Sequence, residues 1–487
     1  MNGKELVFST PENVGIPSGA IAEFIRKLQE QRLCMHSVLV FRKGKLVSEG
    51  YATPWHVDRK HRMYSISKSF TALGIGLLLD EGKISLDDPI VKFYPEYVPG
   101  PVHPFISDAT IRDMLTMRDP HDHTLSGLAD WFSTPPTHPP GTVFMYNTTC
   151  TNLLCGIIEK LSGVTLMEHL YPRLLEPIGF TPGCICIKGH WGYSWSGSGI
   201  ICTPRDLARV AMVCMNGGRW GDKQLISEAY IKEATGRQTD NSLTSRDAER
   251  WAGYGYQIWR TRNNGFAFWG MGSQFAICLP DQELMLVCTA DTQGIDTAEA
   301  TVIKSFWDTI YAGLSDEALP ENAAALAELK ELNDNMKLMV QPGENTVPVA
   351  SVVSGKTYSL FANASGWSDV RFEFKADGGR MIYTNKRGKK EIPFGFGKQA
   401  GFGFPETHFP GDTYNVAGGK EYEAWASAGW VDHRTLSILC HLTDDHIGNL
   451  RINAVFDGDR VTILLRKSAE GFLMDYEGWV YGYSNAN

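Results

Sequence analysis

The sequence predicts a mixed α/β (α+β) fold: an antiparallel sheet flanked by helices and carrying a helical insertion, followed by an all-β, barrel-like domain. Three observations lead to this prediction. Short runs of β-branched and aromatic residues occur near the start of the chain and return between residues 253 and 290. Between them, from about residue 85 to 240, apolar residues recur mostly at helical spacing. After residue 354, alternating runs separated by glycine-rich turns replace the helical pattern.

Each predicted element has a local signal. Ser37–Tyr51 forms a hairpin around the turn at Lys43-Gly44-Lys45, and the apolar helix after residue 68 stops near Gly82. Further helices are predicted at 152–161, 204–216 and 297–312, and a loop rich in proline and histidine at 118–141. Strands are predicted at 253–260, 265–269, 274–279 and 284–290. We therefore expect the first hairpin and the later strands to form one sheet.

The domain boundaries are placed where the composition changes. A chain of 487 residues exceeds the size at which one hydrophobic core keeps growing. Residues 1–315 form the predicted first domain, with the helical insertion at about 85–240. The alanine-, glutamate- and leucine-rich stretch at 319–340 predicts a helical linker over 316–350, and Pro348 lies near its end. Residues 351–487 form the predicted all-β domain.

Composition excludes several classes of function. The net charge is −9 and no basic stripe is present, which argues against nucleic-acid binding. The longest apolar stretch, within Phe70–Leu79, is too short to span a membrane, and residues 1–18 lack the pattern of a secretory signal. Ten cysteines in a chain of this length favour reduced thiols, so we expect a cytoplasmic protein. No metal-ligand spacing is found, and no metal or cofactor is predicted.

Ser65 and Lys68 form an SxxK pair at the start of the apolar helix. Positions i and i+3 lie on one face of a helix, so the lysine amine can approach the serine hydroxyl. Serine is a poor nucleophile without an adjacent base. In the first turn, unpaired backbone N–H groups and the helix dipole favour developing negative charge, so the Ser65 N–H can stabilise an oxyanion. The pair therefore predicts a nucleophile and its base, although chance can supply so short a pattern.

Four ordered segments resemble the class C β-lactamase-like serine hydrolases, a family that includes esterases, D-amino-acid peptidases and amidases, and a nylon-oligomer hydrolase. They are Tyr64–Pro89, Pro140–Tyr146 with the helix at 153–163, the segments 198–209 and 216–228, and Phe268–Pro280. The resemblance covers about residues 10–310. It implies a serine hydrolase that cleaves the ester or amide bond of a small molecule or short peptide through an acyl-enzyme and needs no cofactor.

The resemblance also implies individual roles. Tyr146 matches the family's second catalytic base, and whether Tyr146 or Lys68 is the base stays open. The backbone N–H of Gly272 matches the second oxyanion donor, beside that of Ser65. These assignments follow from the matching positions and not from spacing alone.

Two departures from the family pattern narrow the expected substrate. The asparagine that contacts substrate amides is replaced by Thr148, and the lysine of the third motif is replaced by Trp269, followed by Gly270 and Met271. Tryptophan offers area and one N–H donor but no charge. We therefore expect a substrate without a free carboxylate near the scissile bond, rather than a cell-wall peptide or β-lactam.

Several alternatives stay open. Trp131 is a candidate for the substrate-facing wall of the 118–141 loop, whose histidines favour a solvated loop over a metal site. The chain could also be a penicillin-recognising binder, or a D-peptidase or β-lactamase with slow turnover. A Ser-His-Asp hydrolase on another fold is a further class, but the sequence lacks the GxSxG elbow that such enzymes carry. The C-terminal domain is similar to the lipocalin-like barrel of some relatives and could bind a ligand, gate the site or support a homo-oligomer.

Overall fold

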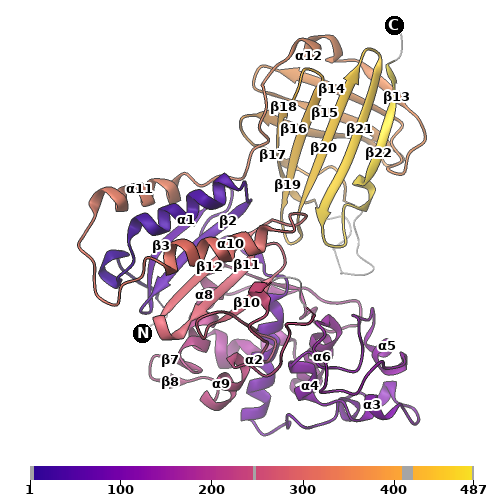
Figure 1. The fold of residues 1–487 in the computed structure, drawn as a ribbon. Helices are drawn as coiled ribbons and strands as arrows, with labels where there is room; N and C mark the ends of the chain where they lie inside the picture. Colours follow the sequence, from indigo (N-terminus) through magenta and orange to yellow (C-terminus); the bar gives the residue numbers. More distant parts are fainter. Residues whose placement is uncertain (1–4, 245–247, 408–420, 485–487) are drawn as a thin grey trace. The chain divides into compact units, whose positions relative to one another are not determined.

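The chain forms two compact units in the computed structural model, which describes residues 5–244, 248–407 and 421–484 (Figure 1). The first unit comprises residues 1–292 and 296–337, and the second comprises residues 293–295 and 338–487. The stretch 316–350 is therefore divided between the units. Its helical part, α11 (Ala323–Asp334), lies in the first unit, where it packs against α1 (Ser18–Glu30) and β3 (Lys45–Tyr51).

A seven-stranded sheet forms the centre of the first unit, in the order β1-β3-β2-β12-β11-β10-β9. All neighbours pair antiparallel except β1 and β3, which are parallel. The pairing of β2 with β12 joins the first hairpin to the later strands, which confirms the predicted sheet. The remaining strands of the sheet are β1 (Val7–Phe8), β2 (Met35–Arg42), β9 (Trp259–Arg260), β10 (Phe266–Gly270), β11 (Gln274–Leu279) and β12 (Leu284–Ala290).

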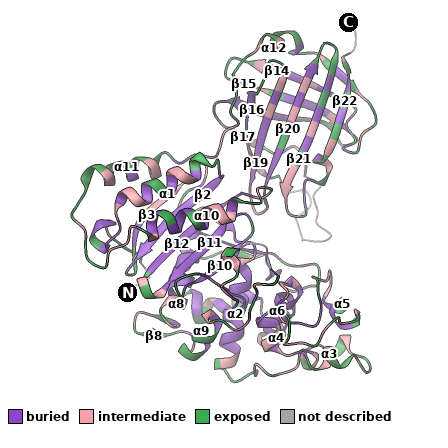
Figure 2. Ribbon diagram, in the orientation of Figure 1, coloured by how far each residue is buried: buried purple, intermediate pink, exposed green. Residues whose placement is uncertain are grey.

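Helices cover this sheet. Every residue of β2, β11 and β12 is buried, as expected of strands covered on both faces (Figure 2). Helix α1 packs with α10, α8 packs on β11 and β12, and α2 packs on β10. The helices are α2 (Ile66–Asp80), α3 (Pro104–Ser107), α4 (Ile111–Leu115), α5 (Leu128–Ser133), α6 (Thr148–Ser162), α7 (Leu166–Leu170), α8 (Pro204–Met215), α9 (Glu228–Thr235) and α10 (Ala298–Phe306).

One predicted strand is much shorter in the structure. Of residues 253–260, only Trp259 and Arg260 form a strand. Gly253 and Gln257 adopt positive φ angles of 106° and 57°, which interrupt an extended chain. Gln257 instead binds the helices around it: its backbone carbonyl accepts from Ser69 Oγ of α2 at 2.9 Å, and its side chain contacts α4 and α6. The segment therefore serves as a connection between helices.

The second unit is a closed barrel of nine strands. Its sheet runs in the order β16-β15-β14-β13-β22-β21-β20-β19-β18-β17, and the parallel pairing of β16 with β18 closes the ring, leaving β17 as an attached strand. This confirms the predicted all-β barrel. The strands are β13 (Thr357–Leu360), β14 (Asp369–Lys375), β15 (Gly378–Asn385), β16 (Gly388–Phe396), β17 (Ala400–Gly403), β18 (Glu423–Trp430), β19 (Thr435–Thr443), β20 (Ile447–Asp457), β21 (Arg460–Ala469) and β22 (Gly478–Ser484).

The barrel interior is aromatic. Alternating residues along the strands point inward, and Phe372, Phe394, Trp430 and Phe456 are among the buried side chains of this core. The Trp430 ring lies 5.3 Å from that of Phe374 and 5.8 Å from that of Phe456. A short helix, α12 (Pro348–Val353), precedes the first barrel strand where a linker had been predicted, and its Val353 is buried in the same core.

Candidate active site

Ser65 lies where a small sheet passes into helix α2. This sheet has the order β4-β6-β5, with β4 (His61–Arg62), β6 (Ile200–Cys202) and β5 (Ile185–Cys186). After β4, Tyr64 adopts a φ of 48°, which residues other than glycine rarely adopt, and the chain turns into the helix with Ser65 as its N-cap. Ser65 is partly exposed, whereas residues 66–78 are buried. Its hydroxyl is therefore the accessible functional group of this first turn.

Packing around Arg62 supports the strained turn. A residue held in the left-handed region costs about 1–3 kcal/mol, so the surrounding structure must stabilise it. The buried Arg62 guanidinium lies 4.8 Å from the Tyr64 ring and 4.5 Å from the Trp195 ring. Its Nε donates to the carbonyl of Ser198 at 3.0 Å. These contacts hold the backbone that presents Ser65.

Lys68 contacts Ser65 as the SxxK spacing predicts. Its Nζ donates to Ser65 Oγ at 3.1 Å and to the carbonyl oxygen of Gly197 at 2.6 Å. The same nitrogen lies 5.0 Å from the centre of the Tyr146 ring. Lys68 is only 1% exposed, so these neighbours replace most of the water around its amine. The structure thus brings together all three residues predicted to be catalytic.

Tyr146 belongs to an aromatic cluster. Its ring stacks on Trp259 at 5.3 Å with an interplanar angle of 25° and meets Tyr254 edge-on at 6.3 Å. Tyr254 is fully buried, and burial raises the pKa of its phenol well above the ordinary value. Tyr254 therefore stays neutral, whereas Tyr146 is partly exposed and lies beside a cation. Of the two phenols, Tyr146 is the one that is partly accessible and lies beside Lys68.

Two residues that the sequence did not single out contribute to the site. Gly197 provides the carbonyl that accepts from Lys68, and its N–H donates to Asn152 Oδ1 at 3.3 Å. A Cβ atom at Gly197 would lie 2.4 Å from Thr148 Cγ2 and 3.6 Å from Lys68 Nζ. The methyl group of Thr148 thus packs against Gly197. A signal for Asn152 exists: it is a polar residue one helical turn after Thr148, on the same helix face.

The third motif differs from expectation. Trp269 is 4% exposed, and its indole N–H donates to Glu299 Oε2 at 2.9 Å rather than facing a ligand. The Gly272 N–H, expected to be an oxyanion donor, donates to Glu299 Oε1 at 3.1 Å. Arg250 pairs with the same carboxylate and lies 4.2 Å from the Trp269 ring. In this conformation neither N–H is available to a substrate, because Glu299 accepts both.

Gly270 and Met271 lie at the turn of the same hairpin. A Cβ atom at Gly270 would lie 2.4 Å from the carbonyl oxygen of Met63, so only glycine fits there. This places the end of β10 against the turn that leads to Ser65. Met271, the next residue, is 38% exposed. Of the predicted third-motif contacts, Met271 has the most accessible side chain.

Trp131 does not fit its predicted role in substrate binding. It is fully buried, and its indole N–H donates to Asp119 Oδ2 at 3.1 Å. His121 is also buried and lies 3.4 Å from that carboxylate, whereas His123 is exposed and contacts Asp122. The two histidines therefore differ in their surroundings, since one is buried and the other is exposed. Within the described residues, no group of three or more histidine, cysteine, aspartate or glutamate side chains is arranged to hold a metal ion.

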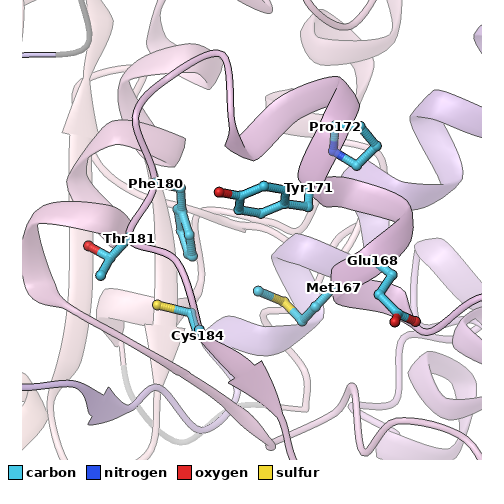
Figure 3. Close-up of a pocket in the computed structure, with 8 residues that line it drawn as sticks. Met167, Glu168, Tyr171, Pro172, Phe180, Thr181 and Cys184 are labelled. Carbon is cyan, nitrogen blue, oxygen red and sulfur yellow. The ribbon is translucent and has the colours of Figure 1, made fainter.

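A separate hollow of about 260 Å³ lies beside α7 and contains none of the predicted site residues (Figure 3). Met167, Tyr171, Phe180 and Cys184 make much of its wall. Burial, followed by the charge of Asp206, raises the pKa of the Cys184 thiol to about 12, so this cysteine is no nucleophile at neutral pH. The hollow is not the hydrolytic site.

No helix in the described part of the chain has the length and apolar character needed to cross a lipid bilayer.

Comparisons with known proteins identify the family of the first unit. The sequence profile of the Beta-lactamase family matches residues 21–303. The 6-aminohexanoate-dimer hydrolase of Paenarthrobacter ureafaciens is 26% identical over 295 residues, which are 54% of this chain and 74% of that protein. Esterase EstB of Burkholderia gladioli is 28% identical over 181 residues, 36% of this chain and 41% of the esterase.

A solved structure extends the likeness to the fold. The penicillin-binding protein homologue from Caulobacter crescentus superposes with a TM-score of 0.50 at 17% identity, covering 64% of this chain and 99% of the other. At this identity the match supports the fold alone. The family profile covers more than half of the chain and includes Ser65, Lys68, Tyr146 and Trp269. The chain therefore belongs to the beta-lactamase family of serine hydrolases.

Proposed function

We propose that this protein hydrolyses ester or amide bonds of a small substrate through an acyl-enzyme on Ser65. The observation that carries the proposal is the 3.1 Å contact between Lys68 Nζ and Ser65 Oγ, beside the Tyr146 ring. A serine hydroxyl needs such a partner to become a nucleophile. The relatives named as a 6-aminohexanoate-dimer hydrolase and an esterase support this reaction class.

In the proposed acylation step, Ser65 Oγ attacks the substrate carbonyl carbon while its proton passes to the Lys68/Tyr146 pair. The N–H of Ser65, at the start of α2, stabilises the negative charge on the carbonyl oxygen. The pair then protonates the leaving alcohol or amine, and the C–O or C–N bond breaks. In deacylation the same groups take a proton from water, which attacks the acyl carbon and returns Ser65 to its starting state.

We propose a substrate that lacks a carboxylate next to the scissile bond. The position of the family's third-motif lysine carries Trp269, and the nearby Arg250 is paired with Glu299, so no excess positive charge is offered there. The exposed Met271 supplies an apolar contact. A small ester, an amide or a short peptide with a neutral flank fits these features.

A second candidate has one observation in its favour. The contact of the Gly272 N–H with Glu299 occupies the amide that would serve as the second oxyanion donor. A site with one donor acylates and deacylates slowly, because each such donor contributes about 10²–10³ in kcat. This favours a penicillin-recognising binder, or a D-peptidase or β-lactamase of low turnover, as the alternative.

The cellular compartment and the partners of the enzyme are also proposals. All ten cysteines are free thiols, which supports a reducing compartment such as the cytoplasm. A small molecule is the proposed partner at the site, and assembly into a homo-oligomer is a further proposal that sedimentation of the purified chain would test.

The proposal is tested with a fluorophosphonate probe and a panel of substrates. We expect the probe to label Ser65, as mapped by mass spectrometry, and Ser65→Ala to abolish both labelling and turnover of short-chain aryl esters or D-amino-acid amides. A wild-type protein that is not labelled at Ser65, or a Ser65→Ala variant with full turnover, would refute the mechanism. Labelling with rapid turnover of a chromogenic cephalosporin, but not of esters, would favour the alternative.

A further inference from the structure

Asp119 is a buried carboxylate close to the segment that carries Tyr146. It has no exposed surface, and its Oδ2 accepts hydrogen bonds from Asn147 Nδ2 at 3.0 Å and Trp131 Nε1 at 3.1 Å. His121 Nδ1 lies 3.4 Å from the same oxygen. Burying a carboxylate is costly unless donors surround it, and here the N–H groups of Asn147 and Trp131 stabilise Asp119.

Residues 117–125 run alongside the segment that contains Tyr146. The N–H of Met145 donates to the carbonyl of Met117 at 2.8 Å, and the N–H of Thr148 donates to Thr124 Oγ1 at 3.2 Å. The backbone is thus held on both sides of Tyr146. Asp119 adds a charged acceptor between these two points.

Asn147 links Asp119 to Tyr146. One end of its side-chain amide donates to Asp119, and the other end, Oδ1, accepts from the N–H of Thr149 at 2.9 Å, where it caps helix α6. With both ends bound, the orientation of Asn147 is determined. The residue before it is Tyr146, whose ring lies beside Lys68.

The Cys150 thiol does not compete with this contact as a second negative charge. Cys150, on the first turn of α6, is fully buried, and burial together with the Asp119 carboxylate raises the pKa of its thiol well above the ordinary value. The thiol therefore stays neutral and adds no second negative charge beside Asp119.

We propose that Asp119 is a positioning residue for hydrolysis, which holds Tyr146 beside the Lys68 amine by way of Asn147. The inference rests on the proposed function, in which Tyr146 and Lys68 share the Ser65 proton. A displacement of about 1 Å in such a group can reduce the rate about 100-fold. Losing the Asp119 contact frees Tyr146 to move away from Lys68, which weakens proton transfer without removing any reacting group.

The test compares three variants of the full chain by their rate of fluorophosphonate labelling at Ser65 across pH. Asp119→Asn keeps the size of the side chain but removes its negative charge, so the hydrogen bonds from Asn147 and Trp131 lose their charge assistance. Asn147→Ser keeps an oxygen to cap α6 but loses the donor to Asp119. Asp130→Asn is the matched control. Asp130 is an exposed carboxylate in the first turn of α5, where it accepts from the N–H of Gly127.

We expect Asp119→Asn and Asn147→Ser to lower the maximal labelling rate about 10-fold or more and to change its pH dependence. The altered position of the Tyr146 ring beside Lys68 causes both changes. Asp130→Asn should stay within about 2-fold of wild type. Melting curves confirm that each variant is folded at the assay temperature, and if Asp119→Asn does not fold, Asn147→Ser decides.

Two results would overturn the inference. Wild-type labelling rates and an unchanged pH midpoint in folded Asp119→Asn and Asn147→Ser would refute the positioning role while leaving the proposed function intact. A wild-type protein that is not labelled at Ser65 would refute the proposed function and this inference with it. The two failures are distinguished by the wild-type measurement alone.

Discussion

The first and third motifs of this active site differ in what holds them. Ser65 and Lys68 lie one helical turn apart on α2, and their 3.1 Å contact follows from helix geometry. The turn after Trp269 is instead tied to Glu299, which lies 30 residues further along the chain. The comparison teaches that helix periodicity brings the two members of a short-range pair together, whereas the chemistry of a hairpin turn depends on which distant side chain accepts its N–H groups.

The largest effect is expected from the short-range pair. Lys68→Met should lower turnover about 10²–10⁴-fold, because the methionine fills the stem of the buried lysine but cannot accept a proton. Steady-state kinetics on an aryl ester would measure this loss. Lys60→Met, at a partly exposed lysine that contacts the carbonyl of Gly183, is the control and should retain activity. A Lys68→Met variant with more than about a tenth of the wild-type kcat would contradict the role of the pair.

A smaller effect is expected at Gly197, a distant residue whose carbonyl binds the lysine of the short-range pair. Gly197→Ala would place a methyl group 2.4 Å from Thr148 Cγ2, and the resulting shift of the Gly197 carbonyl away from Lys68 should lower kcat about 10–100-fold. Adding Thr148→Ser removes the obstructing methyl group and should restore most of the rate. Gly100→Ala, with no atom within 4 Å of its added carbon, is a neutral control. Failure of the double variant to recover would show that Gly197 matters for another reason.

The turnover rate should be less sensitive to substitution at the partner of the β10–β11 hairpin. Glu299→Ala removes the acceptor of Trp269, Gly272 and Arg250, and we expect a loss of about 1–3 kcal/mol in unfolding free energy and about 10-fold in kcat. Denaturant titration and ester kinetics would measure both. A rise in kcat would instead mean that Glu299 withholds the Gly272 N–H from the oxyanion, which would favour the slow-turnover alternative in the wild type.

The last prediction concerns the pH dependence of stability, not activity, and extends the comparison to the barrel. Burial lowers the pKa of His61 in the first unit to about 3 and that of His441 in the second to about 4, from an ordinary 6.5. Below pH 6.5 the unfolded chain therefore binds protons that the folded chain does not. Stability should fall as pH falls, by about 1.4 kcal/mol per pH unit for each histidine, until the folded pKa is reached.

Urea unfolding at pH 7, 6 and 5 would measure this slope in each unit. His441→Gln should flatten the slope of the second unit and leave that of the first unchanged. An unchanged slope in both units would mean that other groups dominate the acid sensitivity.

Local patterns predicted much of the fold. The strands at 274–279 and 284–290 were predicted at the bounds that the structure has, because alternating or apolar runs flanked by turn residues are local signals. The barrel was recognised from its repeated short strands. The segment 253–260 was read as a strand, but the positive φ angles at Gly253 and Gln257 serve contacts with distant helices that no local pattern records.

In the site, too, some features were predicted from the sequence and others were not. Ser65, Lys68 and Tyr146 were predicted from the motif and its resemblance, and they meet in the structure. The partners of the third motif were missed, because Arg250 and Glu299 have no spacing that links them to Trp269. Trp131 was misjudged because an aromatic residue in a loop rich in proline looks exposed, whereas its N–H is bound to a buried carboxylate.

The sequence by itself determined which groups are candidates for the reaction: a serine and a lysine one helical turn apart, followed by a tyrosine motif and a strand in which tryptophan replaces lysine. Helix periodicity is a local property, so the sequence alone places Ser65 and Lys68 on one face of a helix. Only the tertiary structure decided which carbonyl binds Lys68, which carboxylate holds Asn147 and which N–H groups of the hairpin are occupied. Hydrogen-bond partners across hundreds of residues depend on how elements pack, and packing is decided by the whole chain.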